Sequence, residues 1–368
     1  MGEKGNNMYN FLGKELKSPL IIGSGPLTYS AQGCKILSDA GAGAVVTKTI
    51  RKERAINPAP HMVRNTANAL INNEKWTDFD PEQWINYEIP QMKKDGTVCI
   101  ASVGHTLPES SELVEQVVNA GADFVELVSY DYRDLIPMLK DAKSKVNVPV
   151  IVKLPPMIDN IGDFCKELEE AGADAITACD SVGPAFRIDI ETGKPLLGGN
   201  GFGWLSGETI KPITLHKIYE IRQKVNIPII GLGGCVSGDD AVEMIMAGAN
   251  FIGICSVVIL KGAPVINKIH NDLKATLERL GYSSISEACG IVHKHMGKAN
   301  EGESFEFVYD EEKCTKCKMC ERVCAYQARK LNDKMELNEK ECRYCGLCIS
   351  VCKPKALNSK ERMVVENC

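Results

Sequence analysis

The cysteines of this 368-residue chain are crowded near one end, where their spacing suits iron–sulfur ligation. Nine of the sixteen fall in the last 55 residues. Eight of these form two identical Cys-x2-Cys-x2-Cys-x3-Cys runs, which begin at Cys314 and Cys342. Such a run wraps three thiolates around one face of a cuboidal cluster, whose corners tolerate only a few residues between ligands. The spacing predicts two [4Fe–4S] clusters, and zinc ribbons are the less favoured alternative.

The fourth cysteine of each run lies too far round to reach the same cluster, so we expect it to bind the other one, as in two-cluster ferredoxins. The two predicted ligand sets are Cys314, Cys317, Cys320 and Cys352, and Cys342, Cys345, Cys348 and Cys324. The segment 305–357 resembles a bacterial-type two-cluster ferredoxin domain, although the proline that usually follows each fourth cysteine is replaced by Ala325 and Lys353. Such clusters carry single electrons, so we expect this module to relay electrons between a partner and another redox centre.

A helix–glycine–strand unit recurs along the first 300 residues. Four copies of an Ala-Gly-Ala or similar phrase, at 40–43, 120–123, 171–174 and 247–250, each close an amphipathic stretch and precede an apolar run. Glycine suits the end of a helix because it accepts the left-handed conformation there. Repeated units of this kind predict a parallel sheet with crossover helices.

Eight short apolar runs bounded by turn residues are the candidate strands of that sheet: 20–22, 45–46, 98–101, 124–127, 150–153, 175–177, 227–231 and 251–254. The alternation predicts an α/β fold, a (β/α)8 TIM barrel over residues 1–303, followed by a ferredoxin-like domain over 304–368. A doubly wound sheet is the rival, but the chain lacks a dinucleotide-binding fingerprint.

Composition and charge exclude some classes of function. Hydrophobic residues make up 44% and charged residues 25%, as in an ordinary globular protein with a substantial core. The net charge of −5, with scattered lysines and arginines, argues against nucleic acid as a partner. No apolar run approaches the length of a membrane span and the first residues lack the apolar stretch of a signal peptide, so we expect no membrane association and a cytoplasmic location.

Two late loops carry small residues where a barrel commonly holds phosphate. Gly231-Leu232-Gly233-Gly234 ends the seventh predicted strand, and Ile254-Cys255-Ser256 ends the eighth. Small residues let backbone N–H groups approach an anion. Taken alone, a plain tight turn explains the glycine pair about as well.

Three segments carry a family resemblance: Thr47-Lys48-Thr49, Val152-Lys153-Leu154-Pro155-Pro156, and the stretch 205–215. They resemble the dihydroorotate dehydrogenases and, more closely, the FMN and iron–sulfur half of dihydropyrimidine dehydrogenase. The likeness runs from about Asn10 to Leu357 and includes the order of the domains. It implies FMN as a cofactor beside the two clusters.

The resemblance also implies which residues bind FMN. Ser24 and Gly25 would lie beside the flavin ring, and Lys48 and Lys153 near its polar edge, where a lysine stabilises the negative charge of the reduced ring. The phosphate and ribityl chain would be held by Ser206, Gly207, Gly233, Gly234, Cys255 and Ser256. This agrees with the loop argument above.

The residues implied for the substrate depart in part from the family. Asn72 and Glu74 match an Asn-x-Glu that holds the pyrimidine in dihydropyrimidine dehydrogenase. After the sixth strand the family's Asn-Thr or Asn-Ser is replaced by Asp180-Ser181, so a carboxylate that only accepts stands where an amide both donates and accepts. A loop cap is the structural alternative for Asp180.

The largest departure follows the fourth strand. Family members read Asn-Leu-Ser-Cys-Pro and continue into a glycine-rich loop whose cysteine, or serine in some branches, exchanges a proton with the substrate. This chain reads Glu126-Leu127-Val128-Ser129-Tyr130-Asp131-Tyr132-Arg133 and turns directly into a helix, so the usual residue and its loop are absent. A proton donor or acceptor is still required. Tyr130, Tyr132 and His105 are the candidates, Tyr130 first, and each could instead serve in packing or as a helix cap.

The predicted function is an FMN- and iron–sulfur-dependent oxidoreductase acting on CH–CH bonds. It would reduce or form a C=C bond in a dihydropyrimidine-like heterocycle or another activated alkene. Because no NAD-binding motif is present, an FAD/NAD(P)H reductase subunit or a ferredoxin would exchange electrons through the clusters, in a homodimer or hetero-oligomer. The alternative is an electron-transfer subunit of a larger complex without its own organic substrate.

Overall fold

The computed structural model describes residues 8–296 and 305–360. The chain divides into two compact units, Met1–Met296 and Gly297–Cys368, and each is described by itself. The predicted domain boundary between residues 303 and 304 lies outside the described residues. None of the helices within the described ranges is both long and apolar enough to cross a membrane.

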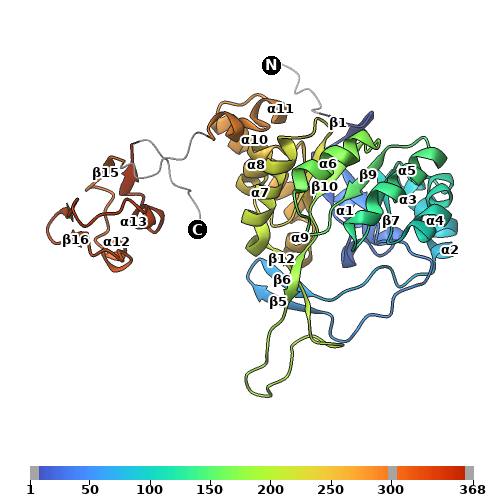
Figure 1. The fold of residues 1–368 in the computed structure, drawn as a ribbon, viewed down its shortest axis with the longest axis horizontal. Helices are drawn as coiled ribbons and strands as arrows, with labels where there is room; N and C mark the ends of the chain where they lie inside the picture. The colour runs from blue at the N-terminus through green and yellow to red at the C-terminus, as the bar shows by residue number, and fades with distance from the viewer. Residues whose placement is uncertain (1–7, 297–304, 361–368) are drawn as a thin grey trace. The chain divides into compact units, whose positions relative to one another are not determined.

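The first unit is a closed barrel of eight parallel strands, ringed by helices (Figure 1). The eight strands follow one another around the barrel in chain order. They are β3 (Leu20–Ile22), β4 (Ala44–Val46), β7 (Cys99–Gly104), β8 (Phe124–Val128), β9 (Val150–Lys153), β10 (Ala175–Ala178), β13 (Ile229–Leu232) and β14 (Phe251–Ile254). Each coincides with one of the eight runs expected from sequence, so the predicted (β/α)8 barrel is confirmed.

One main helix follows each strand and covers the outside of the barrel. These helices are α1 (Ala31–Asp39), α3 (Ile89–Lys94), α4 (Leu107–Asn119), α5 (Leu135–Lys145), α6 (Ile161–Glu170), α7 (Lys211–Arg222), α8 (Gly238–Ala247) and α10 (Val265–Arg279). Shorter helical segments are η1 (Pro26–Thr28), α2 (Pro81–Gln83), η2 (Trp84–Glu88), η3 (Tyr132–Asp134), η4 (Glu208–Ile210), α9 (Ser256–Lys261), α11 (Ile285–Ala288) and η5 (Ile291–Lys294).

Alternation along the strands separates two apolar cores. On β3, Leu20 and Ile22 belong to the large core beneath the helices, whereas Ile21 belongs to the core inside the barrel. The hairpin of β1 (Tyr9–Phe11) and β2 (Lys14–Leu16) closes the barrel floor, because the ring of Phe11 packs 5.2 Å from Phe124 and 4.7 Å from Phe251. Since that end is filled, only the carboxyl ends of the strands remain for a ligand.

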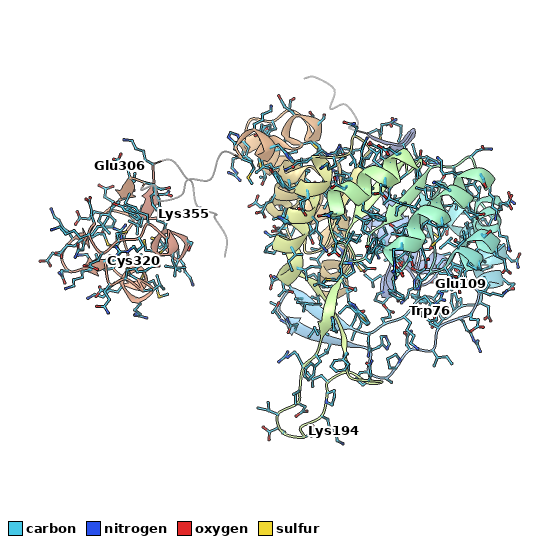
Figure 2. All side chains as sticks on the ribbon, viewed as in Figure 1. Trp76, Glu109, Lys194, Glu306, Cys320 and Lys355 are labelled. Carbon is cyan, nitrogen blue, oxygen red and sulfur yellow. The ribbon has the colours of Figure 1, made fainter. Side chains whose placement is uncertain are left out.

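Two long excursions from the barrel pair with each other. They form a four-stranded sheet in the order β11 (Val182–Ala185), β12 (Gly203–Gly207), β6 (Ala69–Asn72) and β5 (Met62–Thr66). The register sets Trp204 opposite Asn72. Gly207 has a φ of +89°, and a Cβ there would lie 2.2 Å from the carbonyl oxygen of Asn68, so the close approach of β12 to β6 requires glycine. Between β11 and β12 the chain reaches out to Lys194 (Figure 2).

The second unit consists of two structurally similar halves. Its strands are β15 (Phe307–Tyr309), β16 (Arg329–Leu331), β17 (Met335–Leu337) and β18 (Leu357–Ser359), and its helices are α12 (Met319–Arg322) and α13 (Leu347–Ser350). Left-handed backbone recurs at matching offsets in the two cysteine runs, at Lys316 and Tyr344 and again at Lys318 and Gly346. The repeat in sequence is therefore also a repeat in backbone conformation.

Candidate active site and cluster sites

A large cavity lies at the carboxyl ends of the barrel strands. It encloses about 1370 Å³ of empty space, part of it open to solvent. Its lining includes every residue that sequence analysis assigned to the cofactor or the substrate, from both the barrel and the excursions. They are Ser24, Gly25, Lys48, Asn72, Glu74, Lys153, Asp180, Ser181, Ser206, Gly207, Gly233, Gly234, Cys255 and Ser256.

Two buried lysines of the cavity are already paired with carboxylates. The Nζ of Lys48 lies 2.5 Å from Glu74, and that of Lys153 lies 3.1 Å from Asp180. Burial lowers the pKa of Lys48, and Glu74 opposes this shift. Burial alone would also lower the pKa of Lys153, but nearby carboxylates, first Asp180 and then Glu126, raise it above its ordinary value. The ammonium group of Lys153 is therefore held charged in a water-poor site, and that of Lys48 is supported by Glu74 against the effect of burial.

Glu126 is a buried carboxyl group beside Lys153. It lies on β8, is 1% exposed, and its Oε2 accepts a hydrogen bond of 2.9 Å from the Thr177 hydroxyl. Its Oε1 is buried without a partner among the described residues. Burial raises the pKa of Glu126, while Lys153 partly offsets the rise. The family carries an amide at this position, so this carboxyl group is a second change of chemistry beside that at Asp180.

The other end of the cavity suits a phosphate. Among the described residues, no hydrogen bond is donated by the backbone N–H of Gly233 or Gly234. Gly234 has a φ of +98°, and a Cβ there would lie 2.7 Å from the backbone nitrogen of Lys211. Ser256 donates a hydrogen bond of 2.9 Å to Ser206 across the excursion sheet. Unused N–H groups, hydroxyls and buried lysines fit the phosphate and the polar ring edge of FMN.

Three aromatic rings from three different loops form one wall of the cavity. His105 lies between Trp76 and Tyr130, with ring centroids 5.9 and 4.3 Å away. Behind the wall, Arg51 places its guanidinium 4.1 Å from the Trp76 ring and binds both carboxylate oxygens of Glu109. Trp76 and Glu109 are labelled in Figure 2. This ion pair holds the tryptophan in place, since it fixes the cation stacked upon it.

His105 is expected to remain neutral well below pH 7. It is 7% exposed, its Nδ1 has no partner among the described residues, and burial, reinforced by Arg51, lowers its pKa to about 4. The folded state therefore binds fewer protons than the unfolded state between about pH 6.5 and 4, so stability is present above pH 6.5 and lost as the pH falls. We predict a loss of about 2 kcal/mol by pH 5 and about 3 kcal/mol by pH 4 from this group.

Urea unfolding at pH 7 and pH 5 measures this effect, when the wild type is compared with His105→Gln. The exposed His216 on α7 supplies the matched control, His216→Gln, which should keep the pH dependence of the wild type. Equal pH dependence in all three proteins would contradict the prediction.

The two predicted tyrosines lie in different surroundings. Tyr130 lines the cavity but is 68% exposed, and the rise in its pKa from partial burial and from Asp180 is modest at a residue this open to solvent. Tyr132 does not line the cavity. Its ring instead packs edge-on against Phe164, 5.1 Å away, within the core beneath the helices. The structure therefore places Tyr132 in a packing role, which was one of its two alternatives.

Several cavity residues were not identified from sequence, and Ser129 is the most consequential. It follows β8, lines the cavity, is 3% exposed, and its Oγ accepts a hydrogen bond of 3.2 Å from the N–H of Asp131. Ser129 aligns with the cysteine of Asn-Leu-Ser-Cys-Pro, which precedes the acid–base loop of the family, so its place directly after the end of β8 was the available signal. Trp76 and Trp204, which line the mouth, gave no signal beyond the rarity of tryptophan.

Each predicted set of cluster ligands lines its own small cavity in the second unit. One contains Cys314, Cys317, Cys320 and Cys352, and the other contains Cys324, Cys342, Cys345 and Cys348. Within the described ranges, no three metal-binding side chains converge tightly enough for a single ion. A cuboidal cluster binds four thiolates, and each of the two cavities contains four cysteines.

Comparisons with known proteins agree with this geometry. The family model described as dihydroorotate dehydrogenase matches residues 101–277, and one described as a 4Fe-4S binding domain matches residues 307–328. Similar curated proteins include one from Methanosarcina mazei, 36% identical over 78% of this chain and 95% of its own length. A protein from Caldicellulosiruptor saccharolyticus is 34% identical over 76% of this chain and 97% of its own length. One from Pyrococcus abyssi is 31% identical over 77% of this chain and 98% of its own length. All three are called dihydroorotate dehydrogenase B (NAD(+)), catalytic subunit.

Proposed function

This chain belongs to the dihydroorotate dehydrogenase family, and from that premise we propose that it is an FMN- and iron–sulfur-dependent oxidoreductase for a neutral, dihydropyrimidine-like ring. The observation that carries the proposal is one cavity that brings together two buried lysines, two carboxylates and the N–H groups of Gly233 and Gly234, which have no acceptor among the described residues. Bound FMN would exchange a hydride with one carbon of the substrate.

The lysines would serve the cofactor. Lys48 and Lys153 are 5% and 6% exposed, so their charges act in a medium of low polarity. A positive charge there favours the reduced flavin, which is more negative than the oxidised one. Ser24 and Gly25 would border the ring, and the loop of Gly233 and Gly234 would hold the phosphate.

The charges of the cavity favour a substrate without a carboxylate. Both buried lysines already face carboxylates, Glu74 and Asp180. Of the other lining residues that the structure describes, Lys75 is a cation, but it is exposed at the rim. Ring N–H groups could donate to Glu74 and Asp180, whereas the carboxylate of dihydroorotate would meet like charge. We therefore favour a dihydrouracil-like substrate over dihydroorotate.

The substrate preference is measured by reducing the holoenzyme flavin anaerobically with dihydrouracil or with dihydroorotate. We expect dihydrouracil to have the larger kcat/KM, and Asp180→Asn to shift the ratio toward dihydroorotate by about tenfold or more, because one repelling charge is removed. Asp180→Glu, which keeps the charge, and Asp163→Asn on the surface of α6 are the controls. Preferential oxidation of dihydroorotate by the wild type would contradict this assignment.

Ser129 is proposed to relay the proton, its hydroxyl passing its own proton to water as it takes one from the substrate carbon, and the reverse when the substrate is reduced. It is buried, lines the cavity and directly follows β8, ahead of the helix that replaces the family's acid–base loop. Ser129→Ala is expected to slow reduction of the flavin by substrate about 10²- to 10⁴-fold, the contribution of a positioned acid or base. Tyr130→Phe should cost less than about tenfold, because its hydroxyl is at an open mouth. Stopped-flow measurement at 450 nm decides between them, and the reverse pattern would assign the step to Tyr130.

Electrons would leave or enter through the second unit, one at a time. Two clusters are proposed because both cysteine runs have the same spacing and the same left-handed backbone positions, although the matched family model covers the first run. The exchange partner would be an FAD/NAD(P)H reductase subunit or a ferredoxin. A pure electron carrier would show no flavin reduction by any dihydropyrimidine, so the substrate experiment also tests that alternative.

A further inference from the structure

A buried arginine beside one cluster cavity has no carboxylate partner in the part of the chain that the structure describes. Arg329 begins β16, is 4% exposed, and lines the cavity that also contains Cys324, Cys342, Cys345 and Cys348. Its Nε and Nη2 have no hydrogen-bond partner among the described residues. No residue of the described ranges forms an ion pair with it. Burying an unpaired guanidinium is costly unless an anion completes the site.

The position of the guanidinium is fixed by aromatic packing. Its central carbon lies 3.9 Å from the centroid of the Phe307 ring, and Phe307 stacks in turn on Tyr344 at 5.9 Å. Arg329 and the ligand Cys348 line the same cavity. Packing on Phe307 therefore holds the guanidinium in the lining of this cysteine cavity.

In the described lining of the other cavity the cation is Lys318, which is exposed and not buried. Its lining contains Ala356 and Leu357 where the first contains Ala328 and Arg329, at the same offset that relates the two cysteine runs. Leu357 is 2% exposed and apolar. Two ligand sets with equal spacing thus face different electrostatic surroundings, one with a buried cation and one with a leucine.

We propose that Arg329 makes the two clusters unequal, so that the one held by Cys324, Cys342, Cys345 and Cys348 has the higher reduction potential. Four thiolates leave a cluster anionic, and one-electron reduction adds a further negative charge that a buried cation stabilises. The inference rests on the proposed presence of both clusters. Arg329 would thereby determine which cluster is reduced first, and the first electron would reside on the cluster beside it.

An EPR-monitored redox titration of the holoenzyme tests the proposal. The wild type is expected to be reduced in two separate steps. Arg329→Met should lower the reduction potential of the more easily reduced cluster by at least about 59 mV, which is a tenfold change in the equilibrium constant for one electron. The potential of the other cluster should stay unchanged. Arg329→Lys should restore most of the shift. Lys330→Met removes an exposed charge one residue along the same strand and should move neither potential.

The outcomes separate this inference from the proposed function. A single potential for both clusters in the wild type, or an unchanged potential in Arg329→Met, would overturn the inference and leave the function intact. Iron content that corresponds to one cluster in the wild type would instead refute the two-cluster proposal itself. If Arg329→Met binds too little iron to be titrated, Arg329→Gln supplies the uncharged variant.

Discussion

Replacement of Lys153 by methionine is expected to abolish tight FMN binding and to lower the free energy of unfolding of the barrel by about 2–3 kcal/mol. Lys153 is the partner of Asp180 and lies beside Glu126, so its loss leaves buried carboxylates without a cation. Breaking a fully buried pair costs about 3–5 kcal/mol, and the Asp180 side chain is 35% exposed, so the smaller figure applies. Flavin content and urea unfolding of the purified protein measure the two effects.

A double variant separates the charge of Lys153 from its packing. Lys153→Met combined with Asp180→Asn should recover part of the stability, because one of the two carboxyl groups left without a cation is gone, but it should not recover FMN, because the positive charge is still missing. Lys14→Met removes a partly exposed lysine that pairs with Asp123 near the barrel floor, and it should retain full flavin content. Normal flavin binding by Lys153→Met would refute the role given to this residue.

Replacement of Cys320 by serine is expected to halve the iron of the protein and to disconnect the flavin from its partner. Cys320 lies on α12, is 9% exposed, and belongs to the core of the second unit as well as to the first ligand set. Iron should fall from about eight to about four atoms per chain. Reduction of the flavin by substrate should persist, since no cysteine of this module lines the substrate cavity.

The expectation that the fourth cysteine of each run binds the other cluster provides the sharper test of ligation. Cys352→Ser should remove the same EPR signal as Cys320→Ser, and Cys324→Ser should remove the other one, because each fourth cysteine lines the cavity of the opposite run. The matched control is Cys289→Ser, a thiol of the barrel outside the three cavities described for this chain. If Cys352→Ser removed the signal lost in Cys345→Ser, the cross-ligation would be wrong.

The barrel was predictable because its strands are short, apolar and regularly spaced. All eight runs fell on strands, since a parallel strand buried on both faces must be apolar throughout. The sheet of β5, β6, β11 and β12 was not predicted, because its strands come from excursions more than a hundred residues apart and their pairing leaves no local pattern. Tyr132 shows the same limit on a smaller scale, because the direction of a side chain after a strand depends on the packing of α6 through Phe164.

The site was predictable where a residue type is tied to a fixed place on the barrel. Lys48, Lys153 and the glycine pair follow strand ends, and a closed barrel gathers those ends at one face. Ser129 carries no family motif of its own, and only the fold shows that a residue directly after β8 is buried in the cavity lining. The aromatic wall of Trp76, His105 and Tyr130 was not predictable, because its residues come from three loops and their contacts leave no pattern in the sequence.

The sheet of the two excursions has a bearing on how such an enzyme diverges. Asn72 and Trp204 stand on this sheet, whereas Lys48, Lys153 and the glycine pair belong to the barrel strands and the loops that end them. Mutations near Asn72 and Trp204 can therefore remodel the mouth of the cavity, whereas Ser206 and Gly207, at the end of β12 on the same sheet, are constrained by the cofactor phosphate that they are proposed to hold. A lineage built in this way can acquire a new metabolite by changing part of one surface appendage, while the barrel strands and the end of β12 remain under separate selection.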